Sequence, residues 1–130
     1  MKKLFFCWLA FSCFFSLTGF AQSIEVFAIA KKFCTAVYNN NIPVAKSYMT
    51  TDGARRTPDR MSFSANEKEL YLTKLKHAKY KVIQGVTSSI VTVRFYDPQY
   101  EYLDKRGRWF CCAVTLVKTS QGWKVENYGY

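Results

Sequence analysis

The C-terminal part of the chain alternates apolar and polar residues with a period of two, and this alternation constrains the fold more than any other feature. Two such runs flank the turn residues "TSQG", which predicts an antiparallel hairpin. A regular register places Lys118 opposite Trp123, and it then brings Val114 opposite Asn127. One face of the hairpin is apolar and has to be covered by another layer; its residues are Phe110, Cys112, Val114, Leu116, Trp123 and Val125.

The opposite face of this hairpin is richer in aromatic residues, provided that no β-bulge interrupts the register. Its members include Trp109, Cys111, Tyr128 and Tyr130. Residues 80–86 and 89–96 also show a period of two, which predicts two further strands. In the second of these, apolar residues alternate with Arg94 and Tyr96. We therefore expect Arg94 and Tyr96 to point away from the core, on the same outer face.

The stretch between residues 23 and 38 has helical periodicity instead. Its apolar residues recur on one stripe of a helix, and such a stripe faces the core. Cys34 lies within the stripe, so we expect it to be buried. Ser23 is placed to cap the start of the helix, and asparagines 39–41 are placed to end it, because Asn tolerates a left-handed backbone.

Three further signals complete the expected topology. Pro43 suits the first turn of a short second helix, and residues 51–62 read as a basic loop with Gly53 as a breaker. Ser64 and Glu67 have the spacing of a capping box that opens a third helix. Helices followed by an antiparallel meander predict an α+β fold, with the N-terminal helices packed on a curved antiparallel sheet.

The N-terminus has the three parts of a secretory signal peptide. Two lysines precede an uncharged stretch from Leu4 to Phe20, and the small residues Gly19 and Ala21 mark a cleavage site after Ala21. The sequence therefore predicts a signal peptide at residues 1–21 and a single domain at residues 22–130.

A membrane anchor and a lipid anchor are the alternatives to a cleaved signal. The apolar run is at the short limit for a membrane span, and it contains three hydroxyl residues. In the segment "LTGF", Phe20 stands where a bacterial lipobox has its lipidated Cys. We expect a periplasmic or secreted protein with no stable membrane span after cleavage.

The charge of the domain is strongly positive. Removal of two lysines with the signal leaves 17 of the 19 basic residues against 9 acidic ones, a formal charge of +8. In the cytosol such a charge favours nucleic acid, but export argues against nucleic acid as a partner. Outside the cytoplasm the charge favours an anionic envelope component or an acidic protein, or it serves solubility alone.

Three cysteines remain after removal of the signal. Cys34 and Cys112 both face the core in the expected register, so a disulfide between them is one alternative in an oxidising compartment. Two buried thiols that pack as small apolar residues are the other. Cys111 is then odd and lies on the outer face.

The segments "AKKFCTAVYNNNIPVAKSYMT" and "VTLVKTSQGWKV" carry a family resemblance. Together they resemble the nuclear transport factor 2-like superfamily, and in particular its small exported bacterial branch, whose functions are uncharacterised. The resemblance covers nearly all of residues 22–130. It implies a cone-shaped, cystatin-like fold, in which a curved sheet wraps around the first helix and a pocket opens at the wide end. Some relatives are isomerases, cyclases or dehydratases, and others only bind.

The residues favour a binding role over catalysis. The inward positions of the predicted strands carry no acid or base, and the cysteine spacing is not that of a metal site. We expect no cofactor, no metal and no catalytic residue. The interface residues that we expect on the outer sheet face, where relatives form homodimers, are Arg94, Tyr96, Trp109, Tyr128 and Tyr130. The alternative is an isomerase or cyclase that takes a small apolar ligand into the cone pocket.

Overall fold

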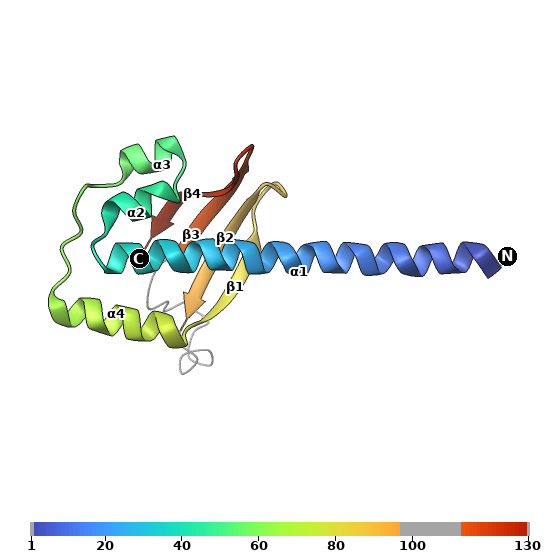
Figure 1. Ribbon diagram of the computed structural model, residues 1–130, viewed down its shortest axis with the longest axis horizontal. Helices are drawn as coiled ribbons and strands as arrows, with labels where there is room; N and C mark the ends of the chain where they lie inside the picture. The colour runs from blue at the N-terminus through green and yellow to red at the C-terminus, as the bar shows by residue number, and fades with distance from the viewer. Residues whose placement is uncertain (1, 97–112, 130) are drawn as a thin grey trace.

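The computed structural model describes the backbone of residues 2–96 and 113–129, and the side chains of residue 19 and of residues 21–96 and 113–129. Within these ranges, helices come first and an antiparallel sheet follows (Figure 1), as expected for an α+β fold. The elements are α1 (Lys2–Tyr38), α2 (Ile42–Ser47), α3 (Thr51–Arg56), α4 (Ala65–His77), β1 (Lys79–Gln84), β2 (Ile90–Tyr96), β3 (Ala113–Thr119) and β4 (Gly122–Gly129).

Helix α1 crosses the sheet and runs on past it toward the N-terminus (Figure 1). Because it begins at Lys2, Ser23 lies inside the helix and does not cap its start, so that prediction is wrong. The predicted cleavage site after Ala21 also falls within α1. Among the residues whose side chains the structure describes, which leave out most of residues 1–20, no helix is long and apolar enough to cross a lipid bilayer.

The end of α1 is where the asparagines predicted it. The helix stops at Tyr38, and Asn40 has a φ of 56°, in the left-handed region. Asn enters that region more readily than most residues, because its short polar side chain bonds locally. The chain then turns into α2, which carries Pro43 in its first turn, as expected.

The four strands pair in chain order, each antiparallel to the next. The outer edge of β4 is not open, because Met49 forms a parallel bridge with Val125. The Thr50 N–H donates to the Val125 carbonyl at 2.8 Å, and the Val125 N–H donates to the Tyr48 carbonyl at 2.9 Å. The segment between α2 and α3 therefore covers this edge of the sheet.

The last hairpin keeps the predicted register only near its turn. Lys118 pairs with Trp123 as expected, but the register shifts between Thr115 and Leu116, and beyond that point Val114 pairs with Tyr128 instead of Asn127. The extra residue lies on β4, where Glu126 has no partner in the register. A bulge of this kind moves every later residue of its strand to the opposite face.

The bulge places Tyr128 on the core side of the sheet. Its ring lies 5.1 Å from the ring of Phe33 on α1, in an edge-to-face arrangement. The prediction that Tyr128 belongs to the outer interface is therefore wrong. A regular strand would direct Tyr128 outward, but the bulge reverses the alternation after Val125.

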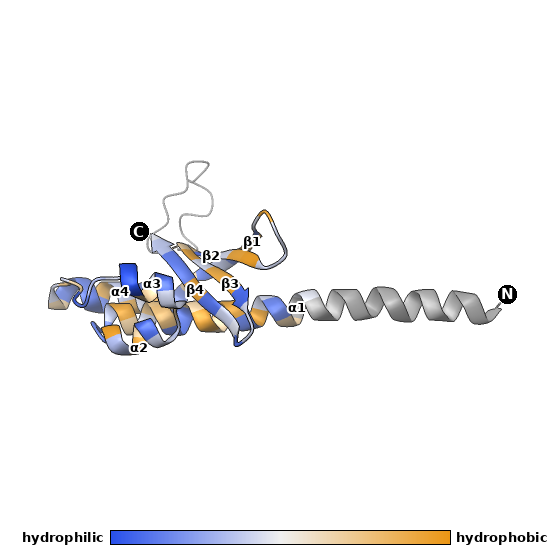
Figure 2. Ribbon diagram, turned by 90° about the horizontal axis from the view of Figure 1, so that it is seen from above, coloured by the Kyte–Doolittle hydropathy of each residue, from blue (hydrophilic) through white to orange (hydrophobic). Residues whose placement is uncertain are grey.

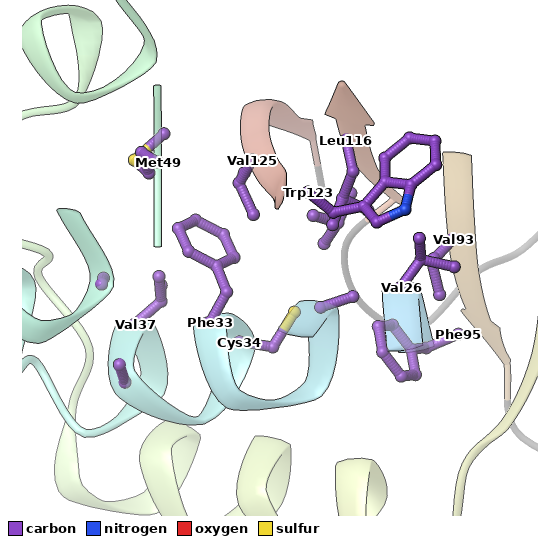
Figure 3. Close-up of a cluster of buried hydrophobic side chains, with 14 of the residues drawn as sticks. Val26, Phe33, Cys34, Val37, Met49, Val93, Phe95, Leu116, Trp123 and Val125 are labelled. Carbon is purple, nitrogen blue, oxygen red and sulfur yellow. The ribbon is translucent and has the colours of Figure 1, made fainter. Parts of the chain in front are cut away.

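The core forms where the apolar stripe of α1 meets the inner face of the sheet. Phe33 points from α1 toward Val125 of β4, and Cys34 and Val37 lie beside it (Figure 3). Cys34 is completely buried, as predicted. The strand side chains that lose all or nearly all of their exposure are Val91, Val93, Phe95, Val114, Leu116, Trp123 and Val125.

Helix α4 is joined to α1 by aromatic contacts. The ring of Tyr71 stacks on the ring of Tyr38 at 5.1 Å. The predicted capping box opens this helix: the Ser64 hydroxyl accepts from the Glu67 N–H at 3.2 Å, and the Glu67 carboxylate accepts from the Ser64 N–H at 2.8 Å. These hydrogen bonds to the ionised form lower the pKa of Glu67.

The segment expected to be a basic loop contains a short helix, α3. The Thr50 hydroxyl accepts from the Gly53 N–H at 2.9 Å and caps the first turn. Asp52 lies in that first turn, and Arg55 and Arg56 lie in the last one, the arrangement that a helix dipole favours.

Replacement of Leu116 by Ala tests the contact between the sheet and α1. Leu116 has no exposed surface, so we expect Leu116→Ala to lower the free energy of unfolding by about 2–5 kcal/mol, measured by urea denaturation. Leu70→Ala on α4 is the control, because Leu70 is 49% exposed and its loss should change stability by less than about 0.5 kcal/mol. Equal midpoints for both variants would contradict the burial of β3 against α1.

Candidate functional site

The outer face of the sheet gathers cations beside an aromatic ring. Lys81 pairs with Arg94 across β1 and β2, and Lys79 pairs with Tyr96. The Lys81 ammonium lies 6.0 Å from the centroid of the Tyr96 ring, within reach of a cation–π interaction. We call these four residues, Lys79, Lys81, Arg94 and Tyr96, the basic corner.

Burial shows that the basic corner faces away from α1. On β2, Val93 and Phe95 are completely buried, whereas Arg94 and Tyr96 are half-buried. On β1, Lys79 and Lys81 are exposed. The expectation that Arg94 and Tyr96 share the outer face is therefore confirmed.

The strands that carry the basic corner contain no acidic residue. β1, β2 and β3, over the residues that the structure describes, hold no Asp or Glu. Beside the corner the face is small and polar: Thr92 and Thr115 pair across β2 and β3, and their hydroxyl oxygens lie 3.2 Å apart. The arrangement is suited to hold an anionic group against an aromatic surface.

The other predicted site residues are not brought to this corner. Tyr128 faces the core, as described above. Trp109, Tyr130, Cys111 and Cys112 lie outside the described residues, so the outer-face role of these aromatics stays a prediction. The disulfide between Cys34 and Cys112 stays a prediction for the same reason.

The sequence reasoning missed Lys79 and Lys81. Both alternate with Tyr80 and Val82 in the segment "KYKVIQ", and that alternation was the signal that could have found them. Tyr80 faces inward and stacks on Phe27 of α1, with 3.8 Å between the ring centroids. The neighbouring lysines are therefore directed outward.

A second polar cluster joins α3 to β4 at the bulge. The Glu126 carboxylate accepts from the Thr50 hydroxyl at 2.6 Å and from the Arg56 guanidinium at 2.6 Å. The Arg56 Nη2 also donates to the Glu126 carbonyl at 3.2 Å. Glu126 is the extra residue of the bulge, and its side chain is directed to α3.

This second cluster attaches α3 to β4, and we assign no catalytic role to it. Both carboxylate oxygens of Glu126 accept hydrogen bonds, one from Thr50 and one from Arg56. Small polar cavities of about 400 Å³ and 300 Å³ lie on its two sides. In the part of the chain that the structure describes, no group of three or more His, Cys, Asp or Glu side chains is placed to hold a metal ion.

The inner face of the sheet is apolar. Over the described parts of β1 to β4, the residues directed toward α1 include two tyrosines but no carboxylate and no imidazole. A ketone isomerase of the kind that the resemblance raises needs a carboxylate in such a position. The inner face therefore supplies an apolar surface without a general base.

No family model, curated protein or solved structure matches this chain. The resemblance to the nuclear transport factor 2-like superfamily accordingly stays a prediction, and function has to be argued from the geometry of the surfaces.

Gly53 provides a test of the junction between α3 and β4. A methyl group at this position would lie 2.8 Å from the Glu126 carbonyl oxygen and 3.1 Å from the Val125 carbonyl oxygen. Helix propensity alone predicts that Gly53→Ala stabilises by about 1 kcal/mol. We expect the clash with strand backbone to prevail and to destabilise the protein by about 1–3 kcal/mol, measured by urea denaturation.

Gly129→Ala is the matched control for this substitution. An added methyl group there meets nothing within 4 Å, so the free energy of unfolding should stay close to that of the parent. A Gly53→Ala variant more stable than the parent would contradict the close approach of α3 to β4.

Proposed function

We propose that this chain is an exported, non-catalytic binding module that holds an anionic envelope component on the outer face of its sheet. The observation that carries the proposal is the basic corner: Lys79, Lys81 and Arg94 stand on two neighbouring strands beside Tyr96, and the described part of the sheet before β4 has no acidic residue. Charge complementarity gives an anionic partner both attraction and fast association.

The same face is the one on which the resemblance implies a homodimer. A two-fold dimer brings the same patch of both subunits together, so the six cations of two basic corners would approach one another unless the two patches were offset. Like charges at an interface cost free energy. We therefore prefer an anionic partner to a second copy of the chain.

We further propose that the fold is the cone of the nuclear transport factor 2-like superfamily. The support is the antiparallel meander in chain order, the packing of α1 against its inner face, and the bulge in β4, because bulges bend a strand and increase its twist. The apolar inner face favours a binding role. An isomerase or cyclase would need an acid or a base on that face.

Export is the first part of the proposal that can be tested. We expect the protein recovered outside the cytoplasm to begin at Gln22, because signal peptidases require small residues before the cleaved bond. Ala21→Arg should abolish this cleavage, whereas Gln22→Asn should leave it intact. The measurement is the intact mass of the exported protein; a mass that retains residues 1–21 in the parent would contradict the signal peptide.

Charge reversal at the basic corner tests binding. With dextran sulfate as the polyanionic probe, we expect Lys81→Glu to weaken binding more than tenfold, since each basic residue at an anionic surface contributes about 1 kcal/mol and the reversal counts twice. Lys68→Glu is the matched control, because it makes the same charge change on the exposed face of α4. Titrations in increasing salt should show affinity falling steeply for the parent.

Equal losses in the Lys81 and Lys68 variants would mean that net charge, and not the basic corner, holds the polyanion. Unchanged binding of both would exclude the corner altogether. Sedimentation of the parent protein tests the rejected alternative, because a stable dimer disrupted by Lys81→Glu would favour self-association through this face.

A further inference from the structure

A groove of about 670 Å³ lies between α1 and α2. Its α1 residues include Lys31, Lys32 and Thr35, which lie on the helix face opposite the buried stripe of Val26, Ala30 and Phe33. In Figure 2, β1 and β2 lie on one side of α1 and α2 lies on the other. The part of the groove beside α2 therefore lies on the opposite side of α1 from the strands that carry the basic corner.

The groove is mainly apolar. Phe27 and Ala36 of α1 contribute to it, together with Val44 of α2 and Tyr48. Val44 is 41% exposed, which is a large fraction for an aliphatic side chain. A surface of this volume and character lies within the range of small-molecule sites.

Among the residues that the structure describes, the charged side chains that line the groove are two lysines, Lys31 and Lys32. The Lys31 ammonium lies 5.7 Å from the ring centroid of Phe27. Neither lysine takes part in the ion pairs found among the described residues, which involve Lys46, Arg55 and Arg56. The lining therefore offers two cations and no carboxylate to a ligand.

The neutral polar groups of the lining are partly occupied by the helix itself. The Thr35 hydroxyl donates to the Lys31 carbonyl at 2.8 Å, and the Asn39 amide donates to the Thr35 carbonyl at 2.9 Å. The Thr35 hydroxyl hydrogen and one of the two Asn39 amide hydrogens are thus already used within α1. The two ammonium groups are the strongest donors that the groove presents.

From this arrangement we infer that the groove binds a single-chain amphiphile with an anionic head group, such as a fatty acid. Lys31 and Lys32 hold the head group, and the acyl chain lies along the apolar wall formed with Val44 and Tyr48. The head group then lies about one turn from the Phe27 end of the lining. The rest of the α1 wall, from 32 to 39, is about 10 Å long at 1.5 Å per residue and is left for the acyl chain.

Charge also argues against two other ligands for the groove: a second copy of the chain, and an amphiphile without a negative charge. A second copy would bring four lysines together in an apolar surface, which like-charge repulsion opposes. A cationic or neutral amphiphile of the same chain length gains nothing from the lysines. The anionic head group is the specific element of the inference.

A head-group series tests the charge. Calorimetric titration of the purified protein with dodecanoate, dodecyl maltoside and dodecyltrimethylammonium, each below its micellar concentration, keeps the chain constant. We expect dodecanoate to bind at least tenfold more tightly than the other two. Equal affinities would overturn the role of Lys31 and Lys32, and no binding of dodecanoate would overturn the site.

Two pairs of variants locate the site. Val44→Glu places a carboxylate in the groove and should weaken dodecanoate binding at least tenfold, whereas Leu70→Glu on α4 makes the same change at a residue that is 49% exposed and should leave it unchanged. Lys32→Glu should weaken binding similarly, with Lys68→Glu as its control. Circular dichroism checks that each variant is folded; equal effects within a pair would overturn the assignment.

A binding experiment with lipid vesicles distinguishes a free amphiphile from a membrane surface as the ligand. Binding to phosphatidylglycerol vesicles, but not to monomeric dodecanoate, would identify a bilayer as the ligand and overturn the inference. Lys81→Glu should leave dodecanoate binding unchanged, since it lies on the sheet face. Failure of the groove and failure of the basic corner therefore give different results.

Discussion

The burial of the inner sheet face against one stripe of α1 is the contact on which the other features depend. Phe33 and Cys34 of the helix and Leu116 of the sheet have no exposed surface, and apolar burial of this kind is the main favourable term in folding. Helix α1 and the sheet each use only one face for this contact. The opposite face of each is therefore not required for the core. The basic corner and the groove are these two remaining faces.

The bulge at Glu126 adds one residue to β4, and this residue produces two contacts. It turns Tyr128 toward Phe33, and it directs the Glu126 carboxylate to Thr50 and Arg56. The strand thus gains a ring for the core and a polar attachment for α3. Sequence reasoning could not place it, because "ENYG" has no clear apolar alternation that would show a change of face.

Local patterns predicted most of the elements, and contacts between distant segments produced the exceptions. Alternation predicted β2 and β3, the Ser64 and Glu67 spacing predicted the start of α4, and the asparagines predicted the end of α1. Gly53 was read as a helix breaker, yet it lies within α3 because only a residue without Cβ fits against the β4 backbone. That reason lies more than 70 residues away in the sequence.

Four of the nine acidic residues form contacts around α2, α3 and the start of α4. Asp52 pairs with Arg55, Asp59 with Lys46 and Glu126 with Arg56, and Glu67 closes its capping box. The first three bind the cations of α2 and α3, so the positive charge of that region is largely balanced locally. Over the residues that the structure describes, β1, β2 and the lining of the groove contain Lys and Arg but no Asp or Glu. Lysine and arginine are therefore concentrated on two faces that the core does not need, and both faces are chemically suited to anions.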